Sequence, residues 1–258
     1  MAITVVTFEG ILISLRTTSN FLTAVLMYID KKPRYVKFNN GFAGVLSWSE
    51  YLHFRHLTYL GFGVRRVDNS DDREYYKRIG FSLPVYVAEK KGYKILFDRS
   101  ILVVLGEPLE KEYTLDVKGK NVLDVGAYKG ETAVWFKILG AKNLVLYEPG
   151  KENIPILKFN LVTNHIAAEV HEKRISERNI SDVLQNSNCE IAKFDCEGAE
   201  IGLANVDGKT LRMLEGYEIE CHSPDVRNTI AKKFISEKFK LTHEYKCNDV
   251  TSVLCFQR

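Results

Sequence analysis

An acidic residue, two glycines and a second acidic residue follow one another between Val122 and Gly150. Asp124 lies in the apolar run VLDV, Gly126 and Gly130 follow it, and Glu148 ends the next apolar run about 20 residues later. Glycines at such a turn let the backbone pass close to a ligand, and the helix start after them offers free N–H groups. An acid at this distance can accept hydrogen bonds from both ribose hydroxyls of an adenosine. The spacing therefore predicts a cofactor that contains adenosine.

The glycine turn differs from the two common nucleotide-binding fingerprints. Its sequence, Gly-Ala-Tyr-Lys-Gly, is not GxGxxG, and it lacks the GKS/T of a phosphate loop. An adenosine without a pyrophosphate fits better, which indicates S-adenosylmethionine. We expect the Glu148 side chain at a cleft and not in the core. The alternative is a solvated carboxylate at the end of a strand.

A cluster of carboxylates follows a later apolar run, in the stretch KFDCEGAE. Asp195, Glu197 and Glu200 fall within one turn beyond the strand, and carboxylates this close raise one another's pKa, which suits a general base. Alternatively, Glu197 and Glu200 cap the next helix start. Asp195 is the member with the strongest case for a functional role.

The stretch YEIECHS holds a second cluster. On a strand, Glu218, Glu220 and His222 point to one face, and His222 beyond the strand end can act as a general base near neutral pH. Asp195, Glu197, Glu220 and His222 could also hold a divalent cation that acidifies a substrate hydroxyl. The spacing does not require a metal, and we assign none.

The elements that must position these residues begin at Lys118, where apolar strands alternate with helices. This alternation predicts a mostly parallel open sheet, and the short link between the last two strands requires an antiparallel hairpin. The predicted strands are 121–126, 143–148, 168–171, 190–195, 215–221, 241–247 and 250–256, and the predicted helices are 131–139, 151–164, 178–186 and 224–238. We expect an α/β domain over 118–258.

Residues 1–117 have a mixed pattern that indicates a smaller α+β region. Asn40-Gly41 and Lys91-Gly92 each separate two apolar runs and predict hairpins. Ser49 precedes a helical spacing of apolar residues that ends at Gly61, which predicts a helix with Ser49 as its N-cap. The region could serve as a lid, a recognition domain or a dimerisation surface.

The stretch from Asn121 to His222 resembles the FkbM family of S-adenosylmethionine-dependent methyltransferases. The resemblance rests on D-x-G-A-x-x-G after the first strand, E-P after the second and D-x-E-G-x-E after the fourth. It implies the seven-stranded Rossmann-like sheet of class I methyltransferases, and methyl transfer to a hydroxyl of a small molecule or glycan. Residues 1–117 carry no resemblance.

The resemblance also implies roles for single residues. Gly126, Ala127 and Gly130 would face the aminoacyl part of the cofactor, Glu148 its ribose, and Asp195 its sulfonium. Tyr128 stands where the family commonly has Asn, which weakens any inference about the substrate. The residues assigned to cofactor binding are Asp124, Gly126, Ala127, Tyr128, Gly130, Thr132, Glu148, Pro149 and Asp195, and those assigned to catalysis are Asp195, His222 and Glu197.

Composition limits the other function classes. The net charge of +3 gives no clear basic excess, so nucleic acid is not the favoured partner. No apolar run is long enough to cross a bilayer, and the first residues do not resemble a signal peptide, so we expect a cytoplasmic protein without membrane insertion. The five cysteines have no zinc-type spacing. Two alternatives remain: an RNA methyltransferase guided by Arg65, Arg66, Lys77 and Arg78, and a non-catalytic binding module.

Overall fold

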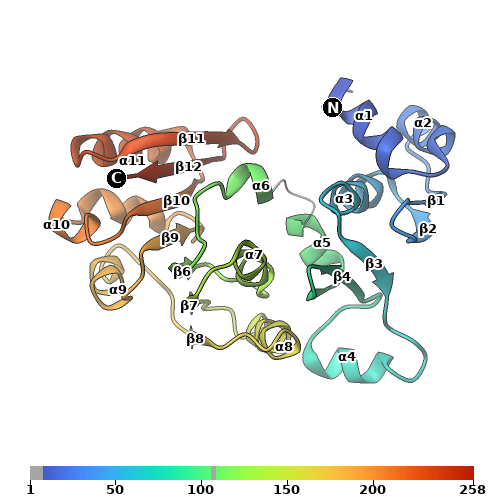
Figure 1. Ribbon diagram of the computed structural model, residues 1–258, viewed down its shortest axis with the longest axis horizontal. Helices are drawn as coiled ribbons and strands as arrows, with labels where there is room; N and C mark the ends of the chain where they lie inside the picture. The colour runs from blue at the N-terminus through green and yellow to red at the C-terminus, as the bar shows by residue number, and fades with distance from the viewer. Residues whose placement is uncertain (1–7, 106–108) are drawn as a thin grey trace. The chain divides into compact units, whose positions relative to one another are not determined.

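The computed structural model describes residues 8–105 and 109–258 (Figure 1). The chain forms two compact units, residues 1–108 and 109–258. The second unit therefore begins before the predicted boundary at 118, and its first residues include the short helix α6 (Leu109–Glu112).

The N-terminal unit is an α+β arrangement around an aromatic core. The two predicted hairpins are present, as β1–β2 and β4–β5, and β3 pairs with β4. Helix α3 is capped by Ser47, whose side chain accepts from the Glu50 amide, so the predicted N-cap Ser49 is wrong by two positions. The elements are α1 (Phe8–Thr17), α2 (Phe21–Asp30), β1 (Arg34–Lys37), β2 (Ala43–Leu46), α3 (Trp48–Tyr59), β3 (Gly63–Arg66), α4 (Arg73–Ile79), β4 (Tyr86–Lys90), β5 (Tyr93–Phe97) and α5 (Arg99–Leu105).

The C-terminal unit contains one sheet of seven strands in the order β11-β12-β10-β9-β6-β7-β8. The strands are β6 (Asn121–Val125), β7 (Asn143–Tyr147), β8 (Ala168–His171), β9 (Ile191–Phe194), β10 (Gly216–Cys221), β11 (Lys240–Lys246) and β12 (Ser252–Gln257). The first five are parallel, and β12 runs antiparallel to both β10 and β11. The predicted sheet with an antiparallel C-terminal hairpin is confirmed.

Helices connect these strands at nearly the predicted positions. They are α7 (Glu131–Leu139), α8 (Ile154–Thr163), α9 (Ile180–Asn186), the 3₁₀ helix η1 (Ala199–Asn205), α10 (Gly208–Leu211) and α11 (Pro224–Ser236). One face of the sheet packs a continuous apolar cluster against α9 and α11, in which Phe194, Tyr217 and Phe234 are fully buried. This cluster is the core of the unit.

The opposite face of the central strands carries buried charged residues. Successive side chains of a strand point to opposite faces, so the residues between the core positions form a second set. Asp124 on β6, Lys193 on β9 and Glu218 on β10 are aligned across the sheet, and each is at most 1% exposed. Buried charges are costly unless they are paired, so this row calls for an explanation.

The strand order reverses direction between β6 and β9. From β6 the chain continues to β7 and β8 on one side, and then returns to place β9 on the other side of β6. Ligands of open α/β sheets bind beyond the carboxyl ends of the strands at this switch point. Among the described residues, no helix is long and apolar enough to span a membrane.

Candidate active site

The ends of β6 and β9 meet at Gly126 and Asp195. Gly126 has φ +86°, and a Cβ added to it would lie 1.8 Å from the carbonyl oxygen of Asp195. The Asp195 amide donates to the carbonyl of Val125 at 3.0 Å. Only glycine allows this approach, so Gly126 brings the turn after β6 against the first residue beyond β9.

The second glycine of the turn sets the position of α7. Gly130 has φ +91°, and a Cβ there would lie 2.9 Å from Cδ1 of Leu157 on α8. Between the glycines, Tyr128 has φ +43°, a left-handed conformation that is uncommon for residues other than glycine. Ala127, also in the turn, is fully buried. The backbone of the turn is thus held in one defined path.

Glu148 is buried, with 6% exposure, whereas the sequence analysis expected its side chain at a cleft and not in the core. Its carboxylate accepts hydrogen bonds from the amides of Tyr128 at 3.0 Å and Gly150 at 2.7 Å, and from the Asn153 side chain at 3.1 Å. These three hydrogen bonds hold the carboxylate of Glu148, the residue before Pro149, against the glycine turn. A carboxylate has about four lone-pair sites, so three donors leave room for a further one.

Asp124 supports the turn from below. Its Oδ2 accepts from the Thr132 hydroxyl at 2.6 Å, and its Oδ1 lies 3.1 Å from Nζ of Lys193. Burial raises the pKa of Asp124, against the opposing effects of Lys193 and Thr132. These contacts make Asp124 and Thr132 part of the scaffold of the turn.

Lys193 connects this scaffold to the end of β9. Its ammonium donates to the carbonyl of Gly126 at 2.7 Å and lies 3.6 Å from Oδ2 of Asp195. Burial alone lowers the pKa of Lys193, but Asp124 and Asp195 raise it well above its usual value. The ammonium of Lys193 thus lies between two carboxylates, and their charges favour its protonated form inside the sheet.

The two carboxylate clusters of the sequence converge on His222. Nδ1 of the ring lies 3.0 Å from Oε1 of Glu200, and Nε2 lies 3.7 Å from an oxygen of each of Asp195, Glu197 and Glu220. Glu200 is fully buried, whereas Glu197 is 84% exposed. The Glu200 hydrogen bond raises the pKa of His222 to about 9, against the effect of burial. Glu200 thus holds the ring through Nδ1, and Nε2 faces the carboxylates of Asp195, Glu197 and Glu220.

Glu200 combines this contact with a role in the local backbone. Its Oε2 accepts from the amide of Gly198 at 2.8 Å. Burial is the largest single effect and raises the pKa of Glu200, but the hydrogen bond and charge of His222 together with backbone hydrogen bonds outweigh it, and the net shift is downward. The capping role considered for Glu200 is thus joined by an ion pair with His222 that the sequence did not predict.

One set of side chains near His222 has the arrangement of a cation site. Asp195, Glu220 and His222 each offer one ligand atom, and these atoms lie within 4.8 Å of one another. Two carboxylate oxygens and an imidazole nitrogen form a ligand set that suits several divalent metals.

Three buried titratable groups lie beside the site, and the sequence analysis assigned none of them a role. Tyr113, in the segment after α6, is 6% exposed, and burial, followed by Asp195, raises the pKa of its phenol. Burial raises the pKa of both Glu131 and Glu218 to about 8. Oε2 of each glutamate has no hydrogen-bond partner among the described residues. Glu218 was noted for its strand face, whereas Tyr113 carried no sequence signal.

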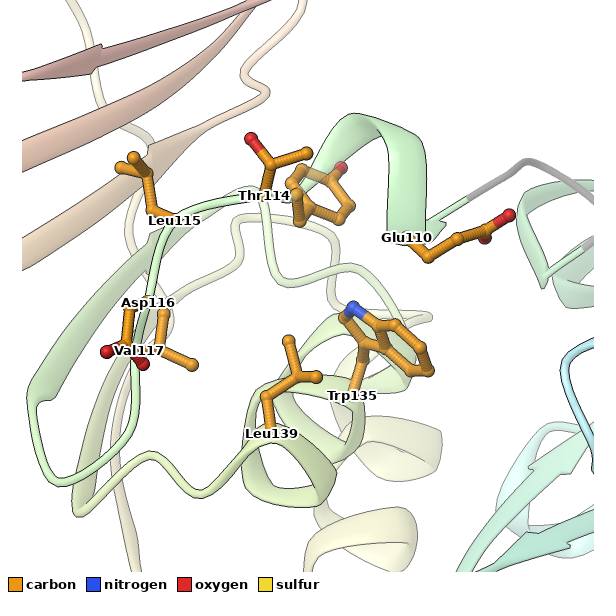
Figure 2. Close-up of a pocket in the computed structure, with 8 residues that line it drawn as sticks. Glu110, Thr114, Leu115, Asp116, Val117, Trp135 and Leu139 are labelled. Carbon is orange, nitrogen blue, oxygen red and sulfur yellow. The ribbon is translucent and has the colours of Figure 1, made fainter. Parts of the chain in front are cut away.

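A hollow of about 290 Å³ lies beside Tyr113, between α7 and the segment that leads to β6 (Figure 2). Trp135 and Leu139 line it from α7, and residues 113–117 line it from the other side. None of the residues predicted to bind the cofactor lines this hollow. It is therefore a separate feature from the glycine turn.

Comparison with known proteins supports the fold. A candidate S-adenosylmethionine-dependent methyltransferase from Streptococcus mutans aligns with a TM-score of 0.50 and 11% identity, over 67% of this chain and 55% of that chain. A candidate RNA methyltransferase from Pyrococcus horikoshii gives 0.46 and 23%, over 62% and 85%. Fibrillarin from Aeropyrum pernix, a complex with S-adenosylmethionine, gives 0.46 and 13%, over 67% and 93%.

These similarities are structural, and the identities are low. No protein-family model matches the chain, and no curated protein matches it. The strand order and the neighbours together show a Rossmann-like, class I methyltransferase fold with an antiparallel C-terminal hairpin.

Proposed function

We propose that the protein is an S-adenosylmethionine-dependent methyltransferase of the FkbM type, which methylates a hydroxyl oxygen of a small molecule or glycan. The observation that carries this proposal is the convergence, at the switch point of the sheet, of the Gly126 turn with Asp195 and His222. A cofactor site and an acid–base group thus lie at the same edge. A non-catalytic module has no need of this combination.

The residues at the turn fit the cofactor. Glu148 offers carboxylate oxygens beside the turn, which suits the hydroxyl donors of a ribose. Gly126, Ala127 and Gly130 provide a backbone path without protruding side chains, and Asp195 places negative charge next to it. When bound, S-adenosylmethionine supplies a methyl group on a positively charged sulfur. An oxygen nucleophile can attack the methyl carbon, and the sulfur then leaves as part of S-adenosylhomocysteine.

We assign removal of the proton from the acceptor hydroxyl to His222 and the carboxylates around it. Nε2 of His222 is the group that accepts this proton, because Glu200 holds the other ring nitrogen. Asp195 and Glu197 stabilise the charged ring that results. With a pKa of about 9, His222 is mostly charged at neutral pH, so we expect the rate to rise with pH toward 9.

A divalent cation at Asp195, Glu220 and His222 is a second mechanism for the same reaction, favoured by the 4.8 Å spacing of their ligand atoms. The cation would lower the pKa of an acceptor hydroxyl directly. The two mechanisms differ in one assay. Activity that survives a chelator supports the histidine base, and activity lost to a chelator and restored by magnesium or manganese supports the metal.

An RNA acceptor has weaker support. Of the four basic residues considered for it, Arg66 pairs with Asp68 and Lys77 pairs with Glu74. The carboxylates around His222 also repel phosphate. We therefore place RNA behind neutral hydroxyl acceptors.

The test is transfer of a labelled methyl group from S-adenosylmethionine to a panel of polyhydroxylated small molecules and oligosaccharides, with RNA as a separate arm. Asp195→Asn and His222→Ala should each lower turnover by about 10²–10⁴ while cofactor affinity changes little. His171→Ala, at the edge strand β8, is the matched control and should keep full activity. Full activity in both site variants would overturn the assignment.

A further inference from the structure

Helices α1 and α2 lie at the start of the N-terminal unit (Figure 1). They expose an unusual number of aliphatic side chains. On α2, the exposed positions follow the i, i+3, i+4, i+7 spacing of one helix face, while Ala24 and Met27 are buried. We call these residues the apolar stripe: Ile11 (39% exposed), Leu12 (36%), Leu15 (49%), Leu22 (77%), Val25 (37%), Leu26 (48%) and Ile29 (70%).

The core of the unit does not use this stripe. Met27 is fully buried, whereas Leu22 and Ile29 remain among the most exposed apolar residues of the described chain. Exposed aliphatic residues gathered on one helix face mark a site of interaction with a protein or a membrane. We therefore expect a binding partner to cover the apolar stripe.

The charges around the stripe distinguish among possible occupants. Residues 8–49, which include both helices, contain five basic residues and two acidic residues, Glu9 and Asp30. Asp30 is paired with Arg34. The remaining basic residues are exposed: Arg16, Lys31, Lys32 and Lys37. The ammonium of Lys31 lies 4.2 Å from the centre of the Tyr28 ring, so its surroundings are partly aromatic.

We propose that the apolar stripe and these basic residues bind the surface of an anionic lipid bilayer, with α1 and α2 lying in the interface. Apolar side chains then enter the boundary of the acyl chains, and the lysines meet the lipid charges. A second copy of this chain would cover the stripe, but its own residues 8–49 carry five basic and two acidic residues, and this net positive charge would repel the lysines of the first copy. A nucleic acid would pair with the charges of the lysines but would leave the aliphatic side chains in water. An anionic bilayer pairs with the lysines and also buries the aliphatic side chains.

Sedimentation of the full-length protein with lipid vesicles tests the proposal. Vesicles of phosphatidylcholine with about one third phosphatidylglycerol should carry the protein down, and pure phosphatidylcholine vesicles should carry much less. Leu22→Gln with Ile29→Gln should lower the partition coefficient at least about tenfold, since two buried aliphatic chains are lost. Lys31→Gln with Lys32→Gln should weaken binding and reduce its dependence on salt.

Val162→Gln is the matched control, because Val162 is 72% exposed on α8 of the C-terminal unit. It should bind vesicles as the wild type does. Thermal unfolding should show that the variants remain folded, since every substituted residue is exposed. Failure to bind anionic vesicles would overturn the proposal. So would light scattering that shows a dimer dissociated by Leu22→Gln with Ile29→Gln, or binding to single-stranded RNA in place of vesicles.

Discussion

The pair formed by His222 and Glu200 gives the sharpest prediction, through the substitution Glu200→Gln. The pKa of His222 is raised to about 9, and the hydrogen bond that its ring donates to Glu200 is the largest cause. A glutamine keeps the shape of the side chain and can still accept from Nδ1–H, but it removes the negative charge. The ring stays in place while its electrostatic environment changes.

The expected size follows from the two protonation states. With a pKa of about 9, about 1% of His222 is neutral at pH 7, compared with most of a free histidine, whose pKa is about 6.5. Asp195 and Glu220 still favour the charged ring in the variant. We therefore expect the pKa of His222 to fall by at least about one unit in Glu200→Gln, but to stay above about 6.5.

The free energy of unfolding should depend on pH through the same two groups, His222 and Glu200. A histidine with a higher pKa in the folded state stabilises the fold fully below its unfolded pKa of about 6.5, and this contribution is lost as pH rises through about 9. Glu200→Gln should therefore reduce the loss of stability over this window. Glu169→Gln, which removes the partner of His171 at 2.8 Å, should not.

Proton NMR titration of the imidazole signals measures this without an acceptor. The chain has six histidines, and His222→Gln identifies the signal of interest. A pKa of His222 near 6.5 in the wild type, or one that stays near 9 in Glu200→Gln, would refute the reasoning. The pH profile of methyl transfer should move with the NMR pKa, which a purely structural role for Glu200 would not produce.

Three further predictions concern the turn and the buried charges. Glu148→Ala should weaken binding of S-adenosylhomocysteine at least about tenfold in calorimetry and lower the melting temperature, since its buried carboxylate accepts three hydrogen bonds. Gly126→Ala should prevent folding, because its Cβ would lie 1.8 Å from the Asp195 carbonyl, whereas Gly41→Ala, with open space at a similar φ, should cost far less. Because burial raises the pKa of Glu218 to about 8, stability should fall as pH rises from about 4.5 through about 8, and Glu218→Gln should flatten that part of the denaturation profile.

The fold of the C-terminal unit was readable from the sequence because its signals are local. Apolar strands such as Asn121–Val125 alternate with helical spacing, and the short link between β11 and β12 permits only a hairpin. The structure confirms both features. The helix cap at Ser47 was missed because Ser49 stands equally close to the apolar spacing, and the reciprocal contact with Glu50 decides between them.

The candidate site was readable only in part. The sequence placed Asp195 and His222 beyond two strand ends, and parallel strands bring such ends to the same edge of a sheet. It could not show that Nδ1 of His222 is held by Glu200, because that contact depends on how η1 packs beside β10. The burial of Glu148 was missed for a similar reason, since its three donors come from two separate loops: Tyr128 from the glycine turn, and Gly150 and Asn153 from the loop after β7.

The buried row of charges had no clear sequence signal. Lys193 lies within the run IAKF, and this run by itself names no partner for the ammonium. Its partner Asp124 lies on the neighbouring strand, and only the register of β6 with β9 aligns the two. Pairing across strands depends on sheet order, which the periodicity of a single strand does not contain.

Binding of cofactors by titration calorimetry tests the central claim most directly. The account predicts that S-adenosylmethionine and S-adenosylhomocysteine each bind at one site per chain, more tightly than NAD, because the turn between Gly126 and Gly130 has no pyrophosphate fingerprint. Tighter binding of NAD, or no binding of either S-adenosyl compound, would contradict it.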